Sequence, residues 1–370
     1  MIAMIAMSYG AFLGVVMMNI EDIETYEYGF GYYEDKLIAL FRSGKPDFET
    51  ADELIRSGAD INAEGKNGDE NILSEILCGY WASDTGKQDC GNESCQRSSC
   101  KGCPQHQSRN PDCGAAMIEV IQYFLRNGFD VNRNDGKYGA QCLFALTTSV
   151  FDRHIIDATK LLFDAGAKNT CISSNPNENE TPLDAIETEG SCQDTIYHNH
   201  HLGNVYEAVY QIYQAVEDGR DYSGIDSYEA IYGKRIERIL SAKPGKNAAF
   251  FEIDLPESKH KNCFTQKLFF ITDGGALITT QYADFWFDKM LPDVETVDVS
   301  DHFPGIVGAV VKRFHYGHNE IRNWATTYGQ PVVTIEMDNA RAVTFTINFG
   351  EVSNEDRAAY FYLGWPENNA

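Results

Sequence analysis

The chain has 370 residues, 43% of them hydrophobic and 12% aromatic, so it is long and apolar enough to bury cores in two or three domains. It carries 30 Lys and Arg against 55 Asp and Glu, a formal net charge of -25. Nucleic-acid binding needs basic side chains that displace counterions from phosphates, so nucleic acids are excluded as expected partners. Residues 1–220 hold 16 of the basic and 34 of the acidic side chains, net -18, which leaves -7 for the rest.

Residues 1–33 form an apolar N-terminal segment and a lead-in. Residues 1–18 contain no Lys or Arg, and the first basic side chain is Lys36. This pattern lacks the positive start of a secretory signal and the flanking anchors of a membrane span. A native start at Met17 or Met18, a packed terminal helix, a weak export signal and a membrane anchor all remain open. No membrane contact is expected unless residues 1–18 are a genuine anchor.

A recurring phrase dominates the next part of the chain. Leu54–Asn62 (LIRSGADIN) returns as Phe124–Asn132 (FLRNGFDVN) and more loosely as Leu161–Lys168 (LLFDAGAK). Residues 34–42 and 48–57 are each predicted to form a short helix, and Gly58 suits a helix end in the left-handed region. One unit is therefore two antiparallel helices and a turn, which would bury its apolar face against its neighbours.

These phrases resemble the ankyrin repeat family, whose unit ends in a Gly-Ala-Asp-Val-Asn-like phrase and opens with Thr-Pro-Leu-His. The opening occurs as Thr181–Ala185 (TPLDA), in which Asp184 replaces the family's histidine, and weaker openings start at Gly68 and Gly139. The resemblance covers residues 34–220 as about four units. It implies an α-solenoid of ankyrin-like helical hairpins.

Binding in this family tends to use the turn tips and the face of the first helices. The resemblance therefore implies a set of candidate binding residues in this chain: Asn67, Asp69, Glu70, Lys137, Tyr138, Gln141, Asn179 and Glu180. Each of them could also be an ordinary solvated turn residue. A basic protein is the partner that the negative charge suits best.

A cysteine-rich insertion is predicted at residues 79–114. Six potential metal ligands lie within it: Cys90, Cys95, Cys100, Cys103, His106 and Cys113. Four of them could close a structural zinc site, although only one C-x2-C pair is present. A loop with reduced thiols and one or two disulfides are the alternatives. No other cofactor is predicted.

Residues 221–370 are predicted to form a separate α+β domain with antiparallel β-hairpins. Residues 267–272 and 276–280 flank Asp273-Gly-Gly, and residues 332–337 and 341–348 flank Asp338-Asn339, which are both turn signals. Residues 231–239 align with residues 306–314, and each segment precedes one hairpin. This alignment favours a duplicated β module, and chance similarity between amphipathic strands is the alternative.

The sequence contains no glycine-rich phosphate loop, nucleophile elbow or H-E-x-x-H motif. We expect a cytoplasmic, non-enzymatic scaffold or adaptor that binds a protein through its acidic ankyrin-like surface. An immunity or inhibitor protein that neutralises a basic toxin is one alternative. The other is an enzyme with its active site in the C-terminal domain, assembled from Asp284, Asp288, His302, His315 and His318.

Overall fold

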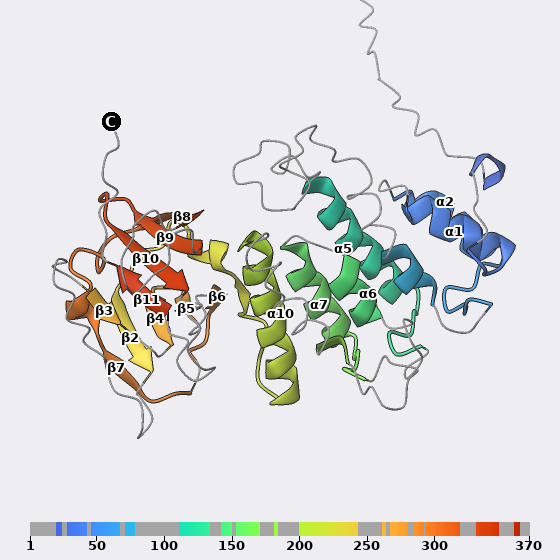
Figure 1. Cartoon of the computed structure of the whole chain (residues 1–370). Coiled ribbons are helices and arrows are strands. Elements are labelled where there is room, and N and C mark those ends of the chain that lie inside the picture. The colour runs from blue at the N-terminus through green and yellow to red at the C-terminus, as the bar shows by residue number, and fades with distance from the viewer. Residues whose placement is uncertain are drawn as a thin grey trace, which may run out of the picture.

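The computed structural model (Figure 1) describes the chain in segments. The described residues are 20–23, 28–42, 46–66, 71–77, 111–133, 142–149, 153–170, 181–183, 200–242, 261–263, 267–279, 285–291, 293–318, 331–347 and 359–362. The N-terminal residues 1–18 and the cysteine cluster from Cys90 to Cys103, with His106, fall outside them, and Cys113 lies in a helix without a described side chain.

Helices fill the first part of the chain and strands the second. The helices are α1 (Tyr32–Arg42), α2 (Phe48–Arg56), α5 (Pro111–Arg126), α6 (Cys142–Ser149), α7 (His154–Asp164) and α10 (His200–Glu217), with the 3-10 helix η1 (Ile20–Asp22) before them. Residues 72–77 are also helical. In Figure 1 these helices follow one another from α1 at one end to α10 beside the strands.

The helices lie in two rows. In the first row α5 packs on α7 and α7 on α10, while the hydroxyl of Tyr123 in α5 donates to Asp52 of α2 at 2.7 Å. In the second row an ion pair joins Arg42 of α1 to Glu75, and Cys142 Sγ of α6 lies 3.6 Å from Asn71 Oδ1. Helix α1 packs on α2 and α6 on α7, so the rows cover each other.

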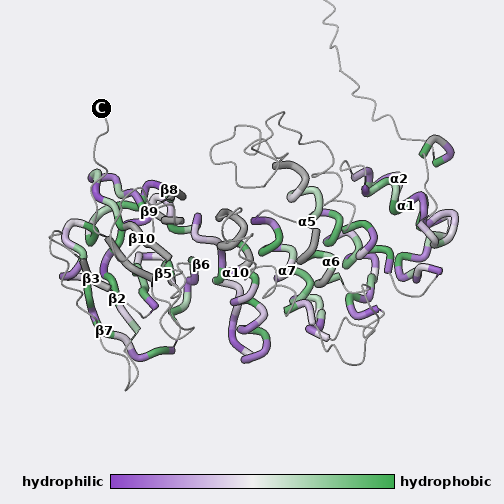
Figure 2. Tube along the Cα trace, viewed as in Figure 1, coloured by the Kyte–Doolittle hydropathy of each residue, from purple (hydrophilic) through white to green (hydrophobic). Residues whose placement is uncertain are grey.

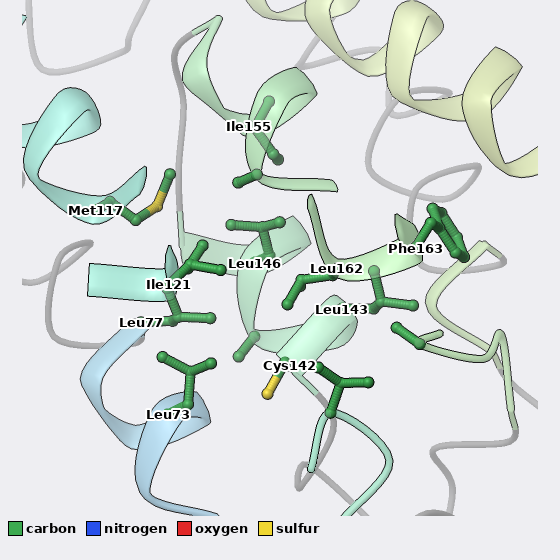
Figure 3. Packing of buried hydrophobic residues seen from close by; sticks show 14 of the residues in the cluster. Leu73, Leu77, Met117, Ile121, Cys142, Leu143, Leu146, Ile155, Leu162 and Phe163 are labelled. Atoms are coloured by element: carbon green, nitrogen blue, oxygen red, sulfur yellow. The ribbon is translucent and has the colours of Figure 1, made fainter. Parts of the chain in front are cut away.

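A continuous apolar core fills the space between the rows. Figure 3 shows Leu77, Ile121 and Leu146, from three successive parts of the chain, pointing toward one another, and each is fully buried. Hydrophobic and hydrophilic residues are interspersed along α1, α2, α7 and the coloured parts of α5 and α10 (Figure 2), which is the pattern of a helix with one buried face, whereas α6 is mostly apolar. Each helix thus depends on its neighbours for burial of its apolar side.

The strands form two antiparallel sheets. The first has the order β1 (Asp226–Ser227), β6 (Phe285–Asp288), β5 (Gly275–Thr279), β4 (Leu268–Thr272), β2 (Arg238–Ala242) and β7 (Thr296–Asp298). The second has the order β3 (Lys261–Cys263), β11 (Ala359–Tyr362), β10 (Ala342–Ile347), β9 (Pro331–Met337) and β8 (Val311–His318). Both hairpins expected from their turns are present, as β4–β5 and β9–β10.

The first sheet is buried on both faces. In β4, Phe269 and Ile271 belong to the core of the helices, whereas Leu268 and Phe270 belong to a second core. That second core also contains Ile335 and other residues of the second sheet. Successive residues of a strand point to opposite faces, so one face packs against α10 and the other against the second sheet. The result is three layers, and α10 joins the two parts of the chain.

Helical structure after Arg220 is limited, among the residues placed by the structure, to the 3-10 helices η3 (Tyr228–Ile231) and η4 (Ser300–His302). The helix that covers the first sheet is α10, which lies before residue 221. The predicted boundary therefore falls just after an element that packs against both α7 and the first sheet. Contacts between α10 and strands that come later in the chain, such as β6, decide this, and no local pattern reports them.

The segments that align in sequence pair with each other. The N–H of Gly233 donates to the carbonyl of Val311, and the N–H of Gly308 donates to the carbonyl of Ile236. The two donors are 75 residues apart in the chain, and so are the two acceptors. Ile236 to Ala309 and Val311 to Lys234 form a second such couple. The four bonds are thus related by a local twofold around the bridge between Arg235 and Val310. This symmetry supports the hypothesis of a duplicated β module.

Candidate binding surface

Four turns of one kind follow the helices α2, α5, α7 and α10. In each, an N–H donates back to a carbonyl five residues earlier: Ala59 to Leu54, Phe129 to Phe124, Ala167 to Leu162 and Arg220 to Ala215, at 2.7–3.0 Å. The residue between is a glycine with positive φ: Gly58 (116°), Gly128 (84°), Gly166 (90°) and Gly219 (66°). Only glycine adopts such a φ without a Cβ clash, which is why the phrase recurs.

Asparagine side chains tie consecutive turns together. The amide of Asn62 donates to the carbonyl of Gly128 at 3.1 Å, and its oxygen accepts from the N–H of Asp130 at 2.8 Å. Asn132 repeats both bonds one unit later, to Gly166 at 2.9 Å and from Lys168 at 3.0 Å. Each carboxamide uses a donor and an acceptor at once, so it fixes the spacing and orientation of two turns.

Glu34 closes this ladder at its first end. Its Oε1 accepts a hydrogen bond from the N–H of Asp60 at 2.7 Å. In the later turns the equivalent N–H donates to the asparagine of the preceding turn, so Glu34 takes the place of that asparagine. At the other end Thr170 stands where Asn62 and Asn132 stand in their turns, four residues after the glycine. Threonine has no carboxamide, so it cannot form the same pair of bonds. The ladder therefore joins the first three turns.

Acidic side chains occupy equivalent places on three neighbouring helices. Glu49 of α2, Glu119 of α5 and Asp157 of α7 each lie nine residues before the turn glycine, and all three are exposed. We call these three residues the acidic column. Packed helices lie roughly 8–10 Å apart, so their carboxylates follow one another at about that interval. Glu49 and Asp157 stand in first turns, where the helix dipole favours them, but Glu119 is in mid-helix, so the dipole does not explain it.

The charges two turns further along the same face differ between units. Two residues before each turn glycine stand Arg56, Arg126, Asp164 and Glu217, all of them exposed. These two positions are therefore of opposite charge in α2 and in α5 and both acidic in α7, whereas α10 has Tyr210 at the first and Glu217 at the second. Two tyrosine hydroxyls donate to carboxylates of these helices, Tyr123 to Asp52 and Tyr222 to Asp164. Burial and the adjacent Asp52 raise the pKa of Tyr123, and burial and Asp164 raise the pKa of Tyr222 to about 12.

A second group of charged residues lies where α7 meets the first sheet. Lys160 Nζ donates to the carbonyls of Ser223 and Ile225, which fastens α7 to the chain just before β1. Burial lowers the pKa of Lys160, although the carboxylate of Asp226 opposes this shift. Burial raises the pKa of Asp288, whose carboxylate accepts from the N–H of Met290 at 2.8 Å. The two hydrogen bonds of Lys160 thus help to hold the helices and the first sheet together.

The binding residues expected from the family resemblance, Asn67, Asp69, Glu70, Lys137, Tyr138, Gln141, Asn179 and Glu180, all lie outside the described residues. Of the residues considered for an active site, Asp284 lies outside the described residues, Asp288 is buried, His302 is exposed, and only the backbone of His315 and His318 is described. No three His, Cys, Asp or Glu side chains gather as a possible metal site within the part that the structure describes. The acidic column was readable as an acid nine residues before each glycine of the recurring phrase.

Comparison with known proteins gives no relative. No family model, no curated protein and no solved structure matches the chain. A search of the described helices also finds none that is long and apolar enough to cross a membrane.

Proposed function

We propose that this chain is a non-enzymatic protein-binding scaffold. In this proposal residues 34–220 form an ankyrin-like α-solenoid of about four helical hairpins, and its acidic surface holds a basic protein. The acidic column of Glu49, Glu119 and Asp157 carries the proposal, because it repeats a charge at one position of three units.

A regular row of carboxylates suits a partner with positive side chains. The potentials of neighbouring like charges add, and a field of this kind accelerates encounter with a cationic protein. The excess of acidic residues in the first 220 residues, net -18, acts in the same direction. A single exposed ion pair contributes about 0.2–1 kcal/mol, so a partner must meet several of these carboxylates to bind tightly.

The spacing of these carboxylates is fixed before a partner arrives. Asn62 and Asn132 hold three turns in register, and Tyr123 links α5 to Asp52 of α2. Binding to a fixed surface loses little conformational entropy, and this favours affinity. The turns and the column therefore support the same function.

The decisive experiment reverses the charge of the acidic column and compares it with a control variant that has the same total change of charge elsewhere. The triple variant Glu49→Lys, Glu119→Lys and Asp157→Lys is compared with Glu237→Lys, Asp293→Lys and Asp301→Lys, which alters exposed acids of the strand region. Both variants change the net charge by the same amount. Tagged proteins are used to recover partners from cell extract, and these are identified by mass spectrometry.

The proposal expects a basic partner that wild type and control recover equally and that the column variant loses. Purified partner then gives an affinity that falls as salt increases, because exposed charges are screened. A partner that both triple variants bind equally would contradict the proposed surface. Recovery of lipid or nucleic acid alone would contradict the proposed function itself.

A further inference from the structure

The two sheets differ at one edge, although four strands of each are arranged in the same order. The meander β6-β5-β4-β2 of the first sheet corresponds to β11-β10-β9-β8 of the second. Beyond β2 the first sheet continues with β7, whose residues 296–298 pair with residues 240–242. At the corresponding side of β8, Val311 bonds to Gly233 and Lys234, and among the strands that the structure describes none pairs with this side beyond Val311.

The backbone of β8 presents the same groups at this edge as β2 does. At the edge of β2 the N–H of Ile239 donates to the hydroxyl of Ser300 at 3.0 Å, and its carbonyl accepts from Val299 at 2.9 Å. At the edge of β8 the N–H of Phe314, 75 residues after Ile239, donates to the hydroxyl of Tyr232 at 3.2 Å. The groups of Phe314 thus point outward, and by the alternation of a strand so do those of Tyr316.

Charge near this edge indicates what it would accept. Asp298 of β7 pairs with Leu240 of β2. The pKa of Asp298 is lowered mainly by two hydrogen bonds from Ser300 and, to a smaller extent, by the guanidinium of Arg238. Arg313 is the counterpart of Arg238 on β8, and beside it stands Lys312. Both side chains are 55% exposed, although both also contact Glu336.

We propose that the outer edge of β8 is a strand-acceptor site for an extended, acidic segment of a partner protein. The segment would add to the second sheet as β7 adds to the first, through backbone hydrogen bonds at the carbonyl of Phe314 and at Tyr316. An acidic side chain of the segment would lie beside Arg313 and Lys312. Backbone pairing supplies the affinity in this mode of recognition, and side chains supply the choice of partner.

A second copy of this chain fits the edge less well than an acidic segment does. Two β8 edges would each bring Lys312 and Arg313, so the positive charges would lack partners across the junction. Strand β8 also has an irregularity between Val311 and Arg313, and such bulges and edge lysines oppose edge-to-edge pairing of like strands. This site is separate from the acidic column, which takes a partner of opposite charge.

The first test is hydrogen exchange of the free, full-length protein, followed residue by residue by NMR. The amide of Ser241 in β2 is covered by β7 and is expected to be protected, whereas the amide of Tyr316 is expected to exchange freely. A protected Tyr316 amide in the free protein would show that the edge is already covered, and the proposal would fail. Protection that increases with protein concentration would instead identify a second copy as the occupant, and the acidic segment would be wrong.

The second test uses a peptide with the sequence of residues 293–300, DVETVDVS, because this segment already pairs at the corresponding edge. The labelled peptide is expected to bind and to protect the Tyr316 amide. Tyr316→Pro removes the outward N–H without removing a bond to β9, so it is expected to abolish binding. Lys312→Glu in the protein is expected to weaken binding about threefold to tenfold, and Asp298→Lys in the peptide is expected to have the same effect.

Arg56→Glu, an equal change of charge on α2, is the control and should leave peptide binding unchanged. Circular dichroism confirms that each variant is folded. Absence of binding up to about 1 mM peptide, or equal binding by Tyr316→Pro, would overturn the strand-acceptor site. Equal weakening by Arg56→Glu would reduce the interaction to general charge attraction and overturn it too.

Discussion

Asn132→Ala tests whether the asparagine ladder stabilises the stacked turns. The substitution removes two hydrogen bonds, to the carbonyl of Gly166 at 2.9 Å and from the N–H of Lys168 at 3.0 Å. A protein hydrogen bond contributes about 0.5–1.5 kcal/mol net, and these bonds are exposed, so water can replace part of each. We therefore expect the free energy of unfolding to fall by about 1–2 kcal/mol.

The assay is urea unfolding followed by circular dichroism, together with amide exchange of Lys168. The matched control is Asn127→Ala, because the amide of Asn127 bonds only within its own unit, to the carbonyl of Tyr123 at 3.0 Å. That control is expected to lose about half as much, since one bond is removed instead of two. The Lys168 amide should exchange faster in Asn132→Ala alone. A loss no larger than that of Asn127→Ala, with Lys168 exchange unchanged, would refute a stabilising ladder.

Four further substitutions have expected outcomes. Glu34→Ala removes the acceptor for the N–H of Asp60, and we expect a loss of about 0.5–1.5 kcal/mol in urea unfolding with faster exchange of the Asp60 amide. Gly128→Ala should lower the free energy of unfolding by about 1–2 kcal/mol, which is the strain of a φ of 84° alone, because the added Cβ meets nothing within 4 Å. Gly275→Ala should lower it further, because its Cβ would also collide with the carbonyl of Asp288. Burial raises the pKa of Asp288 above its ordinary 3.8, so the stability that this group contributes is present below that pH and is lost as the pH rises through the folded pKa. Asp288→Asn should therefore look more favourable relative to wild type in urea unfolding at pH 7 than at pH 4, and the opposite order would contradict the burial argument.

The sequence predicts best what depends on neighbouring residues. The glycine of the recurring phrase marks each helix end, because a positive φ leaves few alternatives, and Asp273-Gly-Gly marks a hairpin for the same reason. The recurring phrase does not mark the fourth turn, at Gly219, because Ala215 replaces the leucine or phenylalanine of the other copies and no asparagine stands four residues after the glycine.

What the sequence could not show depends on contacts between distant segments. Residues 268–272 (LFFIT) are apolar at every position except the last, which fits a strand buried on both sides, yet nothing local says that α10 covers one side and the second sheet the other. The role of Glu34 is equally invisible, because the group that it bonds lies 26 residues later in the chain. The binding tips expected from the family resemblance remain predictions.

The closed ends of the helical rows constrain how this protein can change its length over evolution. Glu34 occupies the place of an earlier asparagine, and α10 is covered by the first sheet, so a further hairpin added at either end would displace an existing contact. A duplication between α5 and α7 would meet no such obstacle, because Asn132 would find another turn of the same form. Longer and shorter versions of this fold should therefore differ by internal units, with the first and last helices kept.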